Sequence, residues 1–89
     1  MNTRAILCAE YVLRLSQALA EIRYAADRPM YQAYLADAAV LLALITRDDA
    51  SPEIDARIAL HERLCSQTFP SGPEQAAVAE AWQRFLRPL

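Results

Sequence analysis

Residues 27–54 read DRPMYQAYLADAAVLLALITRDDASPEI, and the two prolines in this stretch decide the class of fold. A proline suits the first turn of a helix and disfavours helical geometry in the residue before it. Pro29 therefore predicts that a helix begins beside it. The string Ser51, Pro52, Glu53 predicts a second start, with a capping hydroxyl and an acid near the positive end of the helix dipole. Between the two starts the apolar residues follow a helical spacing.

The rest of the chain also has the composition and the spacing of a helical protein. Its 89 residues include one glycine and five prolines, and apolar residues recur at intervals of three and four. Such intervals are typical of helices with one buried stripe, and short connections place successive helices antiparallel. The sequence therefore predicts an all-α protein with a single helical domain, residues 1–89. We expect a small antiparallel four-helix bundle with helices at about 3–26, 29–48, 52–67 and 73–87.

Composition narrows the possible partners. The chain is 55% hydrophobic with a formal net charge of -2, so it should fold, and it lacks the basic surface that favours nucleic acid or an anionic membrane. Its longest apolar run, residues 38–45, is far shorter than the roughly 20 residues of a membrane span. All nine basic residues are arginine, which together with abundant alanine is typical of a GC-rich bacterial genome. We expect no nucleic-acid partner and no membrane partner.

The N-terminal stretch and the two cysteines bear on location. Glu10 interrupts the apolar residues that precede it, so no export signal is predicted, and a cytoplasmic location would keep both cysteines reduced.

Cys8 lies near the start of the first predicted helix and Cys65 near the end of the third. In an up-down-up-down bundle these two helices point the same way, which places the cysteines at opposite ends, tens of ångströms apart. We expect neither a disulfide nor a shared metal.

The nearest approach to a chemical motif is His61, the one histidine, four residues before Cys65. Residues four apart share a helix face. With Cys8 they make three soft donors, too few and too scattered for a zinc site, and no nearby asparagine or aspartate is evident to orient His61 toward a cysteine nucleophile. We therefore predict no catalytic residue, no metal and no cofactor. Cys65 is interpreted as a small buried hydrophobe and His61 as a core-edge histidine with a hydrogen-bond partner.

Surplus apolar surface is the feature that indicates a function. The predicted helix 29–48 is apolar all round from Ala38 to Ile45, and such a helix needs cover on both sides. The first helix has its own second stripe, and a hairpin turning at Pro29 would bring Leu13 level with Leu44, so that the stripes meet as one patch. Apolar patches on small proteins often mark interaction sites. The predicted partner-binding residues are Ile6, Leu13, Ala33, Val40 and Leu44. The open alternative is that the third and fourth helices cover them.

Two functional hypotheses follow. The first is a small soluble bacterial protein-interaction module that acts through this face of the first two helices, as a homodimer, by binding a partner protein, or both. Adaptors, regulators, immunity proteins and cochaperones fit it equally well. The second is a small helical ligand-binding or catalytic bundle whose pocket lies near Tyr11, Tyr31, Tyr34 and His61. The sequence favours a protein that is not an enzyme without deciding the point.

Overall fold

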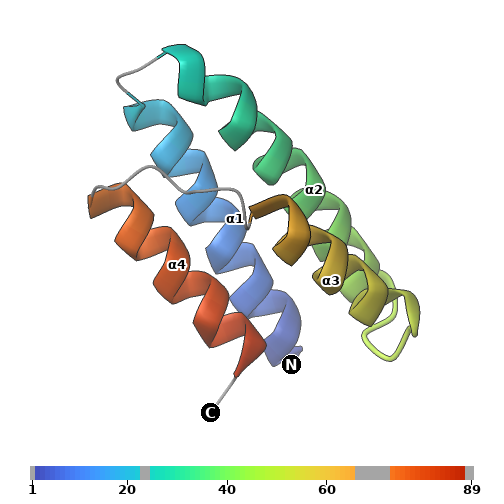
Figure 1. The fold of residues 1–89 in the computed structure, drawn as a ribbon. Helices are drawn as coiled ribbons and strands as arrows, with labels where there is room; N and C mark the ends of the chain where they lie inside the picture. The colour runs from blue at the N-terminus through green and yellow to red at the C-terminus, as the bar shows by residue number, and fades with distance from the viewer. Residues whose placement is uncertain (1, 23–24, 66–72, 88–89) are drawn as a thin grey trace.

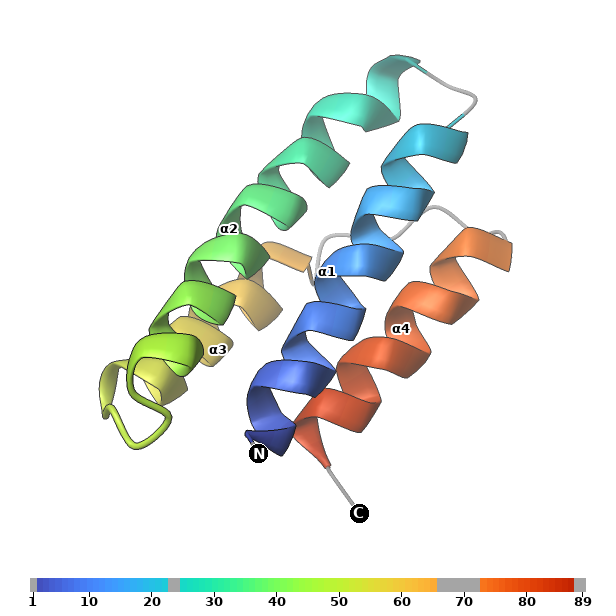
Figure 2. The same ribbon diagram turned by 180° about the vertical axis from the view of Figure 1, so that it is seen from behind.

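The structure is a computed structural model that describes residues 2–22, 25–65 and 73–87. Within these ranges it contains four α-helices, α1 (Thr3–Glu21), α2 (Arg28–Arg47), α3 (Glu53–Cys65) and α4 (Pro73–Leu86), with a 3-10 turn, η1 (Ala25–Asp27), before α2. Helix α1 packs antiparallel against α2 and against α4, and α3 packs antiparallel against α2 (Figures 1 and 2). The predicted all-α, antiparallel four-helix fold is confirmed.

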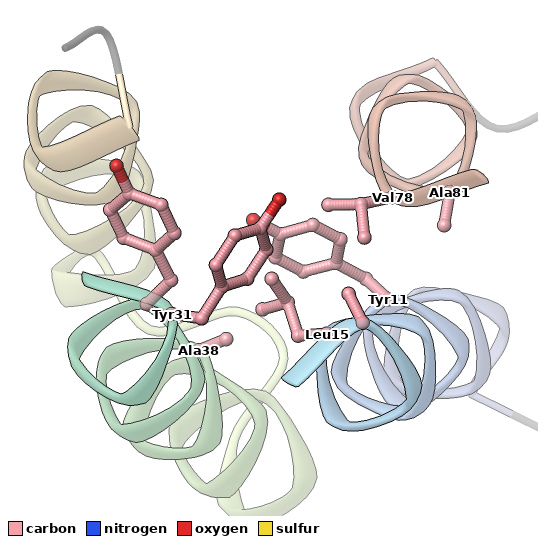
Figure 3. Close-up of a cluster of buried hydrophobic side chains, with 8 residues drawn as sticks. Tyr11, Leu15, Tyr31, Ala38, Val78 and Ala81 are labelled. Carbon is pink, nitrogen blue, oxygen red and sulfur yellow. The ribbon is translucent and has the colours of Figure 1, made fainter. Parts of the chain in front are cut away.

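The helices enclose an apolar core in two parts. Seen along the bundle, α3 lies beside α2 and α4 beside α1 (Figure 3). The upper cluster lies between these helices and consists of Tyr11, Leu15, Ala18, Tyr31, Tyr34, Ala38, Val78 and Ala81. The lower cluster lies toward the end of the bundle that holds both chain termini, and consists of Cys8, Leu41, Ile45, Ile54 and Phe85. The outer sides of α1 and α2 face away from α3 and α4 (Figure 2).

Side-chain caps fix two of the helix starts. The Asn2 side chain accepts a hydrogen bond from the backbone N–H of Ala5 at 3.1 Å, which caps α1. At α3, the hydroxyl of Ser51 accepts from the backbone N–H of Glu53 at 3.3 Å. Each cap satisfies one of the backbone N–H groups that a helix leaves without a partner in its first turn. The start predicted from Ser51, Pro52 and Glu53 is therefore confirmed.

The end of α1 differs from the prediction of a helix over 3–26. The helix ends at Glu21, and Ile22 adopts extended backbone with ψ of 125°. Ile22 nevertheless packs against the upper cluster, so the buried spacing continues after the helix has ended. Apolar spacing reports which residues are buried and not which backbone groups are hydrogen-bonded, and this is why it extended the predicted helix. Residues 23–24, like residues 66 and 67 of the predicted third helix, lie outside the described residues.

The shorter α1 also shifts its register against α2. The side-chain amide of Asn2 donates to the backbone carbonyl of Ile45 at 3.3 Å, so residue 2 lies about level with residue 45. Leu44 is therefore level with the first turn of α1. At 1.5 Å of rise per residue, Leu13 lies about 15 Å further along the axis and Ile6 only about 5 Å. The predicted pairing of Leu13 with Leu44 is wrong, and Ile6 takes the place of Leu13.

Helix α2 is long and apolar enough to cross a membrane by length and composition alone, with a mean hydropathy of 1.3. The uninterrupted apolar run, residues 38–45, is much shorter than a membrane span, whereas the whole helix has 20 residues. The core helix of a water-soluble bundle passes the same test, so this property is weak evidence of a membrane. The charged Asp37 lies at the middle of α2 and contacts α3.

Candidate functional site

His61 lies at the centre of a buried polar network that joins three helices. Its side chain is fully buried. Its Nδ1 atom lies 2.8 Å from an oxygen of Asp37 on α2, and its Nε2 atom lies 2.6 Å from the hydroxyl of Tyr11 on α1. A buried polar side chain of this kind needs such partners to offset its loss of water. The predicted hydrogen-bond partner of His61 is confirmed, while the ring is fully buried and does not lie at the edge of the core.

The chemistry of the partners sets the direction of these hydrogen bonds. An ionised carboxylate only accepts, so the Nδ1–H of His61 donates to Asp37. In that tautomer of the neutral ring Nε2 is an acceptor, and the hydroxyl of Tyr11 donates to it. From the surface side, Nη1 of Arg57 donates to the second oxygen of Asp37 at 3.4 Å. A chain of polar contacts thus runs from a partly exposed arginine to a fully buried ring.

Asp37 is the member of this network that the sequence analysis missed. No aspartate was evident near His61, yet α2 places one there from 24 residues away in the chain. The available signal was its position, because Asp37 is the one charged residue of α2 between the arginines at its two ends. A charge in such a helix is rarely buried unless it is paired. With Cys65 Sγ 3.3 Å from Nε2 of His61, the three residues have the connectivity of an orienting acid, a base and a thiol.

The electrostatics of Cys65 disfavour nucleophilic chemistry. Burial raises the pKa of the Cys65 thiol to about 11, the hydrogen bond with Tyr11 opposes this rise, and the carboxylate of Asp37 adds to it. Cys65 is also the last residue of α3, at the negative end of the helix dipole. Reactive cysteines instead have a lowered pKa in electropositive surroundings. The network therefore holds a protonated thiol, and its evident role is to fasten α3 to α1 and α2.

The two cysteines lie closer together than predicted. The hydroxyl of Tyr11 is 3.9 Å from Cys65 Sγ, and Tyr11 follows Cys8 by one helical turn. A separation of tens of ångströms is therefore wrong. Helix α3 has 13 residues against 19 in α1, and it ends beside the middle of α1 instead of at its far end (Figure 1). Cys8 packs in the lower cluster while Cys65 packs against the upper one. In the part of the chain that the structure describes, no three potential ligands are grouped to hold a metal ion.

The residues proposed for a ligand pocket do lie together, but they fill the space between them. Tyr11, Tyr31, Tyr34 and His61 are each at most 3% exposed. Tyr31 and Tyr34 pack edge to face with ring centroids 5.8 Å apart. A hollow of about 150 Å³ between α1 and α4 is smaller than the roughly 300–1,000 Å³ of most ligand sites. Its lining consists of Glu10, Arg14, Ala77, Glu80, Ala81 and Arg84.

The predicted partner-binding residues mostly remain on the surface. Ile6 is 50%, Leu13 54% and Val40 43% exposed. Ala33 is exposed as well, while Leu44 is partly buried against the lower cluster. Helices α3 and α4 therefore leave the large side chains of this set uncovered, except for Leu44. Whether a partner binds them stays a prediction.

Helix α3 adds two exposed leucines that the sequence analysis did not assign to a binding surface, Leu60 and Leu64. Leu60 follows Arg57 by three residues and Leu64 follows Leu60 by four, so all three share one side of α3. On α2, Ala33 precedes Asp37 by four residues and Val40 follows it by three. Because Arg57 contacts Asp37, these two sides adjoin. We call this the α2/α3 surface, which comprises Ala33, Val40, Leu44, Leu60 and Leu64 around the Asp37–Arg57 ion pair.

Comparison with known proteins does not provide a relative. No family model, no curated protein and no solved structure matches the chain.

Proposed function

We propose that this protein is a protein-interaction module that binds through apolar side chains left exposed by its own fold. One observation carries the proposal: Ile6, Leu13, Val40, Leu60 and Leu64 are between 39% and 54% exposed. Single exposed apolar residues are common on soluble proteins, but stripes of them on adjoining helices are typical of interaction sites. Three of the five were predicted as partner-binding residues from the sequence.

A partner could still bury the part of these apolar side chains that the fold leaves exposed. Full burial of a valine or leucine side chain contributes about 1.5–3 kcal/mol, so a half-exposed one can still gain roughly 1 kcal/mol on contact with a partner. Lost translational and rotational freedom opposes this gain, so several of these side chains must be covered at once for stable binding. A surface on adjoining helices satisfies this requirement better than scattered residues do.

The ligand-binding or catalytic alternative has less support. Its four proposed pocket residues are buried against one another, and the thiol beside His61 has a raised pKa. The same contacts account for a structural role, because they connect α1, α2 and α3. No further observation on the described residues favours this alternative.

Affinity capture with matched variants tests the proposal. Immobilised protein would be incubated with an extract of the organism that encodes it, and captured proteins identified by mass spectrometry. Val40→Glu and Ile6→Glu each place a charge among the exposed apolar residues, whereas Ser16→Glu places the same charge at an exposed polar position of α1. We expect partners, or additional copies of the chain, that wild type and Ser16→Glu retain and that at least one of the other variants loses.

Circular dichroism would first establish that each variant is folded. Equal recovery by all four proteins would contradict the proposal, because binding would then be independent of the apolar side chains. A specific partner, once identified, would also distinguish an adaptor from a regulator, an immunity protein or a cochaperone.

A further inference from the structure

We propose that the occupant of the α2/α3 surface is a second copy of this chain, bound about a two-fold axis. This inference rests on the proposed function and specifies its partner. Leu60 and Val40 are 50% and 43% exposed, and they lie on different helices on either side of the Asp37–Arg57 ion pair. The surface is therefore apolar at its flanks and charged at its centre.

The charges at the centre are self-complementary. A two-fold interface brings the same surface of both copies together, so it must carry groups that pair with themselves after rotation. Asp37 and Arg57 supply one charge of each sign, 3.4 Å apart. An axis that passes beside this pair places Asp37 of one copy opposite Arg57 of the other. The four charges then alternate in sign, and two copies do not repel each other.

Both ions have the capacity for a second contact. The side chain of Arg57 is 39% exposed and contacts Asp37 through Nη1, whereas a guanidinium offers five N–H donors in a rigid fork. Arg57 can therefore bind the carboxylate of a second copy while it keeps its own. Asp37 is 21% exposed and is held from behind by Nδ1 of His61. The buried network thus fixes the carboxylate in position before association, which lowers the entropy that binding would otherwise cost.

The apolar flanks protect these contacts from water. Leu60 and Leu64 lie on the α3 side of the pair, with Val40 and Ala33 on the α2 side. Excluding solvent strengthens the attraction between paired charges but also costs their desolvation, so the four charges set the register of the interface and the apolar side chains supply most of its affinity. A partner with an excess of either charge would repel one of the two ions, and a second copy does not.

Sedimentation equilibrium over a wide concentration range tests this inference. We expect a reversible dimer of wild-type protein. Leu60→Glu or Val40→Glu should raise the dissociation constant by at least about tenfold, because each substitution acts twice in a two-fold interface. Arg57→Met, which keeps the side-chain packing and removes the charge, should also weaken the dimer. Ser16→Glu is the matched control, since Ser16 is an exposed polar residue of α1 outside the α2/α3 surface. Leu13→Glu tests the exposed leucine of α1 as an alternative contact.

The outcomes separate this inference from the proposed function. Wild-type protein that stays monomeric to about 1 mM would overturn the dimer, while the capture experiment would still decide whether another protein binds. A dimer that Leu13→Glu dissociates and Leu60→Glu does not would overturn the assignment to the α2/α3 surface. Helical circular dichroism of each variant serves as the folding control, and Val40→Glu replaces Leu60→Glu if the latter fails it.

Discussion

Asp37→Ala should destabilise the protein far more than removal of a partly exposed acid normally does. His61 is fully buried, and its Nδ1–H would lose the acceptor that lies 2.8 Å away. An unsatisfied buried donor costs about 1–3 kcal/mol, and the lost Arg57 ion pair, which is partly exposed, adds at most about 1 kcal/mol. In a domain of this size each kcal/mol lowers the melting temperature by about 4–8 °C. We expect a decrease of about 10–20 °C in a thermal melt.

Two comparisons make this prediction specific to the network. Asp55→Ala removes an acid that is 89% exposed and pairs with Arg4 at 3.7 Å, so its effect should be within about 0.5 kcal/mol. In a His61→Leu background no buried donor remains for Asp37 to satisfy, so Asp37→Ala should cost much less there. The reasoning is refuted if Asp37→Ala and Asp55→Ala have the same melting temperature. It is also refuted if Asp37→Ala lowers the stability equally with and without His61.

The remaining predictions concern the cysteines. At pH 7.5, iodoacetamide should alkylate Cys65 far more slowly in folded protein than in urea-unfolded protein, because a pKa of about 11 leaves little thiolate; equal rates by mass spectrometry would contradict this. Stability should also fall at alkaline pH, since burial raises the pKa of both Cys8 and Cys65 from 9.0 to about 11. The protonated thiols favour the fold fully below about pH 9, and this contribution is lost as pH rises through 11. A denaturation midpoint equal at pH 8 and pH 10.5 would be the opposite result.

Local chemistry made parts of the fold predictable from sequence. Ser51 and Pro52 act within one helical turn, so the start of α3 could be inferred from residue types alone. Tyr11 and Leu15 could be assigned to the core because burial repeats with the helical period. Both inferences depend only on residues that are close to one another in the sequence.

Contacts between distant residues could not be predicted in the same way. No glycine or proline marks the end of α1 at Glu21, and the five-residue error at this end shifted the register between α1 and α2. The contact between Asp37 and His61 depends on how α2 and α3 lie side by side, which apolar spacing does not specify. The exposure of Ile6, Leu13 and Val40 could be predicted from the sequence, whereas the exposure of Leu60 and Leu64 and their grouping with Val40 depend on how α3 packs against α2.

The position of the one tryptophan gives this protein an optical signal of its own. The indole ring of Trp82 lies 4.9 Å from the imidazole of His61 and 4.8 Å from the ring of Tyr11, measured between ring centroids. A neighbouring imidazole, especially when protonated, quenches indole emission by accepting an electron from the excited state. Separation of α3 from the other helices would carry the imidazole away from Trp82, so the emission should change in intensity when that contact is lost. Fluorescence of the unlabelled chain therefore reports on the contact between α3 and α4.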